Sequence, residues 1–537
     1  MRLFHRAFLQ EKETVVSEKS IISRIGRTVG NFLLLTGLSA ATVCLFTFSY
    51  PKFSYSLLAW LALIPFTWAI FYLRGFWATF FFSWLTGTAV YAALYNWVFI
   101  TCLEGGEMGW GLSMAAWLGL SLLMGIQFAL FGSSCYYFKR LRGFFPVVAA
   151  MGFVALEWFH ETLAFYVLGF PWFSLAYSQW NMPAVLQIAS FTGAAGVSFA
   201  VAFVGLCLGY SFVPASFGKS VRYMVVAAVV FLSVYGLGLL YLKHLPTNNL
   251  LRLHAAIMQP NIDQYKKWSL EFEDEIREVL ATMNAQLVGQ NVMLTVWPEN
   301  VTPGPVEEEP YYTWIAQAAK ESKSFELVGT NRDEQDKQYV SAFLFNPQGE
   351  PVGIYDKVHL VPFGEMIPFE KTVRRLFPNV AVLGELGFFS AGKWPQPLLQ
   401  LDKISFGSTI CYESVFSRLW REQARAGARM LVNITNDAWF FDTSAPYQHL
   451  AISVLRAVEN RRTVLRAANT GISAVISPAG EIVSRAELNT RAILEADVAL
   501  PLSPDISFYT KWGNWFAWLC VLVYVTIFIS AFVFMYE

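Results

Sequence analysis

The chain has 537 residues, of which 55% are hydrophobic and only 15% are charged, and its mean hydropathy is +0.42. This composition is too apolar for an ordinary soluble protein and indicates a membrane protein with several spans. The 39 basic and 39 acidic residues cancel, so the overall charge gives no support for a nucleic-acid partner.

Apolar stretches dominate residues 30–242 and return at the end of the chain. Spans need about 20 apolar residues, and we expect eight of them, near 31–49, 54–72, 76–100, 111–138, 145–167, 184–213, 222–242 and within 513–537. Residues 243–512 have ordinary charge and turn content. The sequence therefore predicts four segments: a tail over 1–29, a membrane domain over 30–242, a second domain over 243–512 and a final helix over 513–537.

Basic residues in the short loops predict the orientation. They occur in the N-terminal tail and then in alternate loops, represented by Arg74, Lys139 and Lys219. Because such loops stay in the cytoplasm, we expect both termini to be cytoplasmic and residues 243–512 to lie on the outer side. The first apolar stretch has no small-residue cleavage site, which predicts an uncleaved anchor.

The segment over 243–512 has the pattern of a layered α/β domain. Short β-rich runs end in Pro, Asn or Asp, and helical patterns over 271–289, 310–322, 413–427 and 447–461 lie between several of them. This alternation predicts helices that cover sheets. In such folds reactive groups collect at the carboxyl ends of the strands.

Cys411 is the one cysteine of this segment, since the other five cysteines lie in or beside the expected spans. Exported domains favour disulfides, but a single thiol cannot form one within its own domain. The thiol is then either inert by burial or used in chemistry.

Three short motifs place reactive side chains at strand or loop ends. VWPEN carries Glu299, YDKVHLVPFGE carries Lys357 and Glu365, and STICYES carries Cys411. A carboxylate base, an ammonium that stabilises an oxyanion and a thiol nucleophile are sufficient for acyl transfer. Taken singly, each also fits a structural explanation: a helix-end carboxylate for Glu299, a solvated charge for Lys357 and an ion-pair partner for Glu365.

Together these motifs resemble the Glu-Lys-Cys signatures of the nitrilase, or carbon-nitrogen hydrolase, superfamily. Combined with eight spans, TNDAWF, YQHL, RAANTGISAVISPAGEI and GFPWFSLAYSQ, they resemble its membrane branch, the apolipoprotein N-acyltransferases. The resemblance implies an α-helical polytopic bundle joined to an αββα sandwich, in the bacterial inner membrane with the catalytic domain in the periplasm.

The resemblance also implies the reaction. An acyl chain would pass from a phospholipid to Cys411 as a thioester, and then to the N-terminal S-diacylglyceryl cysteine of a lipoprotein. Neither a cofactor nor a metal is implied, and we expect a monomer in the lipid bilayer without nucleic acid. The resemblance assigns supporting or substrate-contacting positions to Glu365, Tyr412, Glu413 and Trp268; their structural alternatives are a surface salt bridge, core packing, a helix N-terminal carboxylate and surface aromatic packing.

Several residues depart from the family pattern or carry further expectations. Phe441 stands where Gly is common, Ala445 precedes Pro where Gly is common, and His160 stands where Arg is common. We expect a structural hydrogen bond for His449. Glu157 is an intramembrane carboxylate, and therefore a functional candidate unless it snorkels to the interface.

Two alternatives remain open at this point. One is a membrane-tethered amidase that uses the same triad with water as the acceptor. The other is a non-enzymatic receptor or transporter with a degenerate nitrilase-like domain.

Overall fold

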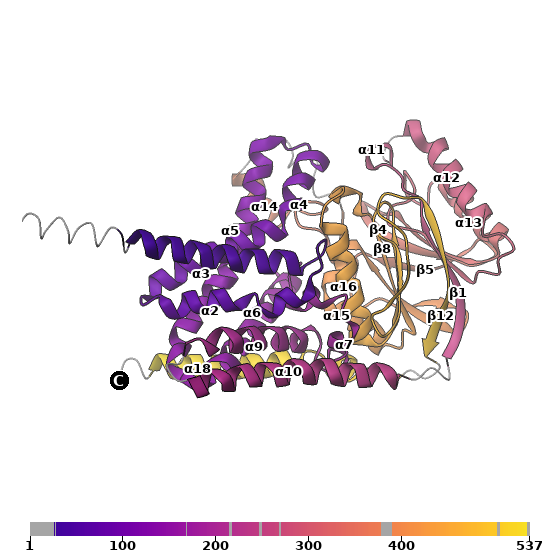
Figure 1. The fold of residues 1–537 in the computed structure, drawn as a ribbon. Helices are drawn as coiled ribbons and strands as arrows, with labels where there is room; N and C mark the ends of the chain where they lie inside the picture. The colour runs from indigo at the N-terminus through magenta and orange to yellow at the C-terminus, as the bar shows by residue number, and fades with distance from the viewer. Residues whose placement is uncertain are drawn as a thin grey trace, which may run out of the picture.

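The computed structural model describes residues 26, 28–167, 169–213, 217–245, 250–267, 270–376, 389–501 and 505–533. A helical half lies beside a β-sandwich half (Figure 1). The expected basic tail before residue 26 and Trp268 lie outside the described residues.

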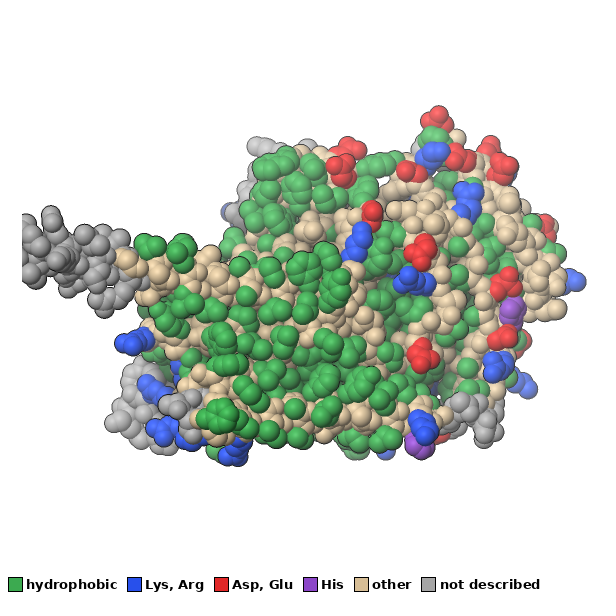
Figure 2. Space-filling model, viewed as in Figure 1, with side chains coloured by type: hydrophobic (Ala, Val, Ile, Leu, Met, Phe, Trp, Pro, Cys, Tyr) green, Lys and Arg blue, Asp and Glu red, His purple; other side chains and the backbone are tan. Residues whose placement is uncertain are grey.

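The helical half is built from apolar segments that follow the predicted spans. Its elements are a helix over Thr28–Ser49, η1 (Ser56–Trp60), α2 (Leu63–Tyr72), α3 (Phe76–Leu94), α4 (Asn96–Ile100), η2 (Thr101–Gly105), α5 (Gly109–Phe138), η3 (Lys139–Phe144), α6 (Phe145–Tyr166), η4 (Leu175–Gln179), α7 (Pro183–Leu186), α8 (Ala189–Thr192), α9 (Ala194–Ser211), α10 (Phe217–Lys243), α17 (Phe508–Trp512) and α18 (Trp515–Val533). Hydrophobic side chains cover the visible face of this half, as a lipid-facing surface requires (Figure 2).

By length and composition, four helical stretches are able to cross a membrane among the described residues: Thr28–Ser49, Gly109–Tyr166, Ala194–Ser211 and Phe217–Lys243. The second of these contains α5 and α6, which meet at a kink with non-helical Arg142. A fifth stretch, α3 with α4 and η2, is bent by 60°. The number of crossings and the limits of the four predicted segments stay predictions.

The span expected near 184–213 has its counterpart in α9, but the first part of that stretch is not continuous with it. The chain there forms α7, α8 and α9, and the break before α9 is at Gly193, whose φ is +69°. A Cβ at this position would lie 2.6 Å from the Tyr509 ring. The left-handed backbone and the close ring together interrupt the helix, although the apolar composition continues through it.

The second half is a sandwich of two six-stranded sheets, as predicted for the αββα class. The first has the order β12-β1-β2-β3-β4-β5 and the second β11-β10-β9-β8-β7-β6. The strands are β1 (Leu250–Gln259), β2 (Leu294–Val296), β3 (Phe325–Glu334), β4 (Lys337–Phe345), β5 (Pro351–Asp356), β6 (Leu399–Leu401), β7 (Ile404–Ile410), β8 (Met430–Thr435), β9 (Thr463–Ala468), β10 (Ala474–Ile476), β11 (Ile482–Arg485) and β12 (Ala492–Pro501).

Parallel strands form the centre of each sheet. β1, β2 and β3 are parallel neighbours in the first, with Ile257 opposite Val296 and Val296 opposite Leu327. β7, β8 and β9 are parallel neighbours in the second, with Ile410 opposite Ile434. The carboxyl ends of the strands within each set therefore share one edge, where the site is built.

Helices cover both outer faces of the sandwich. α12 (Glu273–Ala285) and α13 (Tyr311–Ser322) cover the first sheet, whereas α15 (Ser417–Arg425) and α16 (Ala445–Asn460) lie between the second sheet and the helical half (Figure 1). The shorter helical elements of this half are α11 (Gln264–Lys267), η5 (Leu270–Phe272), α14 (Glu370–Leu376), η7 (Cys411–Val415) and η8 (Asp437–Phe440).

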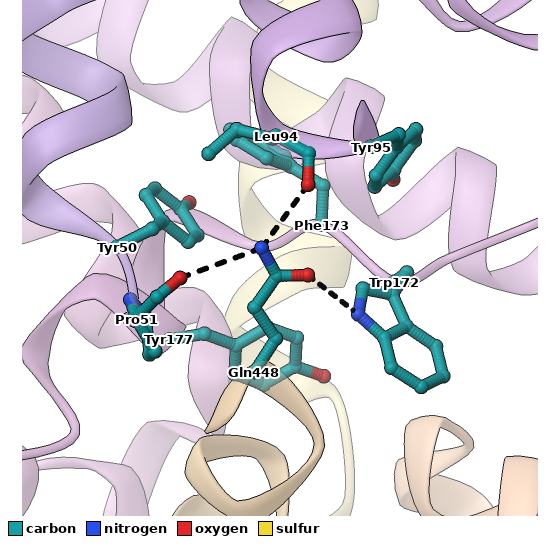
Figure 3. Close-up of a pocket in the computed structure, with 8 residues that line it drawn as sticks. All are labelled: Tyr50, Pro51, Leu94, Tyr95, Trp172, Phe173, Tyr177 and Gln448. Carbon is teal, nitrogen blue, oxygen red and sulfur yellow. Dashed lines mark hydrogen bonds between the residues drawn. The ribbon is translucent and has the colours of Figure 1, made fainter. Parts of the chain in front are cut away.

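The helix α16 is buried along its whole length except at Tyr447. Its Gln448 side chain donates to the carbonyl oxygens of Leu94 at 3.1 Å and Pro51 at 3.5 Å, and accepts from Trp172 Nε1 at 2.9 Å (Figure 3). One amide thus joins three segments of the helical half to the sandwich.

Carboxylates make further polar links between the halves. Glu161 of α6 accepts from the Ser417 backbone N at 3.2 Å and from Ser417 Oγ at 2.6 Å. In the opposite sense, Glu459 of α16 accepts from Ala194 N at 2.9 Å. Each carboxylate lies at the first residue of a helix in the other half, where the helix dipole favours negative charge.

Close packing of α3 on α5 generates a stability prediction. At Gly132 of α5 an added Cβ would lie 1.9 Å from Ser83 Oγ, whereas nothing lies within 4 Å of a Cβ at Gly119 on the same helix. We expect Gly132→Leu to destabilise the protein by roughly 1–3 kcal/mol, because overpacking forces the helices apart. Thermal unfolding in detergent measures this, with Gly119→Leu as the control; equal melting temperatures for the two variants would contradict the packing.

Candidate active site

Glu299 lies in a turn just after β2, with only 4% of its surface exposed. The turn packs on β3 at Gly329, where an added Cβ would lie 2.4 Å from the Pro298 carbonyl oxygen and 2.6 Å from Glu299 Cα. The absence of a side chain at Gly329 therefore lets the turn approach. Glu299 Oε2 accepts from the Asn436 backbone N at 2.9 Å, which ties it to the end of β8 in the other sheet.

Lys357 follows β5 and is fully buried. Its backbone N donates to Val340 O at 2.8 Å, and its ammonium lies 3.0 Å from Glu299 Oε1 and 2.6 Å from Glu365 Oε1. Burial lowers the pKa of Lys357, but these two carboxylates outweigh it and hold the pKa well above its ordinary value. The side chain is therefore a permanent cation.

Cys411 begins η7 directly after β7, with a φ of +51°. This left-handed conformation is strained for a residue with a side chain and is typical of functional positions. Burial and the Glu299 carboxylate raise the pKa of the Cys411 thiol, and the opposing effect of Lys357 is smaller. The free site therefore favours the thiol even beside the lysine, so a base is needed to form the thiolate.

The three predicted residues thus come together from three strand ends. The pKa of the Cys411 thiol responds to both Glu299 and Lys357, and Glu299 and Lys357 form a direct ion pair. A buried carboxylate and ammonium beside a partly exposed thiol suit attack on a carbonyl carbon.

Comparisons with known proteins identify the family of both halves of the chain. Residues 43–207 match the model of the apolipoprotein N-acyltransferase N-terminal domain, and residues 254–504 match that of carbon-nitrogen hydrolases. The apolipoprotein N-acyltransferase of Geobacter metallireducens is 36% identical over 501 residues, which cover 89% of this chain and 91% of that protein. The enzyme of the same name from Allorhizobium ampelinum is 30% identical over 471 residues, covering 84% and 85%.

The chain belongs to the apolipoprotein N-acyltransferase family. It is therefore an acyltransferase of the carbon-nitrogen hydrolase superfamily, and its apolar helices fit an inner-membrane protein.

The supporting residues expected from this family have distinct contacts. Glu365 binds Lys357 through Oε1 and accepts from Val361 N at 2.8 Å through Oε2, so it orients the ammonium. Tyr412 stacks on Phe170 with ring centroids 5.7 Å apart and donates to Gly169 O at 3.1 Å. Tyr412 thus packs the strand end against the helical half.

Glu413 links the Cys411 turn to the Lys357 loop. Its Oε2 accepts from Ile410 N at 2.7 Å and from the Tyr355 hydroxyl at 3.0 Å, while Oε1 accepts from Val358 N at 2.6 Å and His359 N at 3.1 Å. Four donors on one buried carboxylate fix the two loops relative to each other. Glu413 is therefore more than a carboxylate at a helix N-terminus, because its contacts hold the Cys411 turn against the Lys357 loop.

A buried network behind Cys411 was missing from the predicted site. His449 Nε2 lies 3.1 Å from Cys411 O and 2.8 Å from Ser414 Oγ, and Nδ1 lies 2.9 Å from Asp437 Oδ1. Asp437 Oδ2 in turn accepts from Arg466 Nη2 at 2.6 Å. The structural hydrogen bond expected for His449 is present. Asp437 and Arg466 of this network belong to the TNDAWF and RAANTG motifs, which were noted in the sequence without being assigned to the site.

The residues that depart from the family pattern, and the intramembrane carboxylate, have the following surroundings. Phe441 has a φ of +50°, a conformation that Gly adopts without strain, and Ala445 is fully buried at the start of α16. His160 Nε2 is buried without a hydrogen-bond partner among the described residues. Glu157 accepts from Leu175 N at 2.7 Å, which fixes the loop between α6 and η4.

Asp437 predicts how stability depends on pH. Burial raises the pKa of this carboxyl, but Arg466 and His449 outweigh it and lower the pKa to about 2 from an ordinary 3.8. A depressed carboxyl pKa stabilises the fold above the unfolded value, and this stability is lost as pH falls toward 2. We expect the difference in unfolding free energy between wild type and Asp437→Asn to shrink by about 2 kcal/mol between about pH 5 and pH 2.

Unfolding in detergent across this pH range measures that difference. The control is Asp442→Asn, because Asp442 is an exposed acid on the same segment. A pH-independent difference for Asp437→Asn would show that its carboxylate has no depressed pKa.

Proposed function

We propose that this chain transfers a phospholipid acyl group to the N-terminal diacylglyceryl cysteine of a lipoprotein by a two-step, ping-pong reaction through a thioester on Cys411. The relatives' names support lipoprotein N-acylation. The observation that carries the mechanism is the buried ion pair between Lys357 and Glu299 at two strand ends, beside the partly exposed Cys411 at a third.

In the first half-reaction, Glu299 takes the thiol proton and the sulfur attacks the ester carbonyl of the phospholipid. The carbonyl oxygen becomes an oxyanion, which the Lys357 ammonium and a backbone N–H stabilise. The carbon–oxygen bond of the ester then breaks, and protonated Glu299 gives its proton to the departing alkoxide. A lysophospholipid leaves and the acyl chain stays on Cys411.

In the second half-reaction, the α-amine of the lipoprotein attacks the thioester. The nitrogen passes a proton to Glu299, the carbon–sulfur bond breaks and Glu299 returns the proton to sulfur. An amide is released and the thiol is regenerated. Since both substrates are lipids, a catalytic domain packed on membrane helices receives them without transit through water.

The proposed topology places the sandwich in the periplasm and both termini in the cytoplasm. Lys and Arg side chains gather at the end of the helical half that is remote from the sandwich, which the positive-inside rule assigns to the cytoplasm (Figure 2). We further propose that the protein acts as a monomer.

Removing the nucleophile tests the thioester. We expect Cys411→Ala to abolish both the acyl adduct and N-acylated peptide, because no other group takes its place, and Glu299→Gln to slow both half-reactions by about 10²–10⁴-fold. Intact mass after incubation with phospholipid, and then with a diacylated lipopeptide, measures the two steps.

The control is Cys44→Ala, whose thiol is exposed on the helical half. Undiminished N-acylation by Cys411→Ala would rule out the proposed nucleophile. Release of free fatty acid by the wild type, without acylated peptide, would instead favour the amidase-type hydrolase.

Labelling from one side of the membrane tests the topology. We expect a membrane-impermeant maleimide to label Val483→Cys, which replaces an exposed β11 residue, in intact spheroplasts. Arg74→Cys lies in an exposed loop of the opposite predicted side and should react only after lysis. The reverse pattern would invert the proposed orientation.

A further inference from the structure

A second lysine, Lys267, lies at the active site and has no place in the mechanism above. It ends the short helix α11 and is fully buried. Its Nζ donates to the Glu299 backbone oxygen at 2.8 Å, the one hydrogen-bond partner of this ammonium among the described residues. A buried cation with so few partners is costly to the fold, which points to a role beyond stability.

The rest of α11 also holds the segment around the base. Gln264 Oε1 accepts from Asn436 Nδ2 at 2.6 Å, and the Asn436 backbone N is the donor to Glu299 Oε2. On the outer side, the Tyr265 hydroxyl donates to Glu104 O in η2 of the helical half. The helix α11 is therefore held on one side by the segment around Glu299 and on the other by η2 of the helical half, and these contacts fix Lys267 against Glu299.

The charge balance explains why a second cation is useful. When Glu299 and Glu365 are ionised, Lys357 neutralises only one of them. The remaining negative charge adds to burial, the larger effect, in opposing ionisation of Cys411. A protonated Lys267 brings the four groups to neutrality before the thiolate forms.

We propose that Lys267 is a positioning residue for acyl transfer, whose ammonium anchors the carbonyl of Glu299 and supplies a second positive charge that favours the Cys411 thiolate. The inference rests on the proposed role of Cys411 as the nucleophile. It adds a group that acts through Glu299 and Cys411 and leaves the oxyanion contact to Lys357.

The two lysines differ in how they respond to pH. Burial lowers the pKa of Lys267 to about 7, although Glu299 and Cys411 raise it, whereas Lys357 stays charged between its two carboxylates. The titratable groups that act on Lys267 are Glu299 and Cys411, and Glu299 is itself paired with Lys357, which also binds Glu365. Lys267 therefore supplies its charge below about pH 7 and withdraws it above.

Alkylation of Cys411 by iodoacetamide reads this effect without any lipid substrate. In the full-length protein in detergent, we expect Lys267→Met to lower the alkylation rate roughly tenfold at pH 6, the equivalent of one unit in the thiol pKa. At pH 9, where the lysine is neutral, the two rates should converge. A rate ratio that is constant across pH would reveal a merely structural role, and a ratio of one throughout would show no role; either overturns the proposal.

Two further variants complete the test. Lys266→Met is the matched control, because the neighbouring Lys266 is partly exposed and pairs with Glu275; it should alkylate like wild type. Lys267→Arg keeps the charge at every pH and should react faster than wild type at pH 9 but equally at pH 6, so it decides the question if Lys267→Met does not fold. Equal rates for Lys267→Arg and wild type at both values would refute the charge effect.

The readout also separates this inference from the proposed function. Alkylation reports only on the Cys411 sulfur and its surroundings, whereas the acyl adduct and N-acylated peptide report on transfer. Full transfer by Cys411→Ala would end the proposed mechanism whatever the lysine does. A normal adduct together with pH-independent alkylation ratios would end the inference alone.

Discussion

A fully buried ammonium between two carboxylates is the interaction on which the site depends. A charge in an apolar interior is unfavourable unless it is paired, and Lys357 is paired twice. The pairs also join the turn after β2 to the loop after β5, so the charge balance and the geometry of the site have the same origin. Burial, together with the Glu299 carboxylate, raises the pKa of the Cys411 thiol above its ordinary value despite this cation. The resting sulfur therefore keeps its proton, and in the proposed mechanism the nucleophile forms when Glu299 takes it.

The second requirement is that this site be held still beside a fluid bilayer. The structure meets it with polar contacts between the halves: Glu161 at the start of α15, Glu459 at the start of α9, and Gln448 with three segments of the helical half. Apolar packing alone would allow the two halves to shift relative to each other, whereas each of these hydrogen bonds forms in only one relative position. His449 continues the path from Gln448 to the carbonyl of Cys411, so the strand end that carries the sulfur is fixed to the membrane helices.

Much of this architecture follows from patterns local in sequence. Apolar length predicted the helical half, and strand-like runs ending in turn residues predicted the sandwich and placed Glu299, Lys357 and Cys411 at strand ends. Contacts between distant segments were not predictable in the same way. The break at Gly193 depends on the ring of Tyr509, some 300 residues away, and the location of Lys267 depends on a hydrogen bond to a backbone atom. Composition contains neither fact, and a lysine beside Trp268 looks like any surface charge.

The burial of α16 on every side except at Tyr447 bears on how the catalytic part can be isolated. A fragment cut to the sandwich alone would carry this helix on its outside, with the side chains that pack on the helical half uncovered and with Gln448 and Glu459 separated from their partners there. Such a surface would aggregate or draw detergent onto itself. Kinetic measurements on such a fragment would describe a molecule in which the turn that carries Cys411 has lost the helices that support it. The helical half is therefore part of the catalytic unit as well as a membrane anchor.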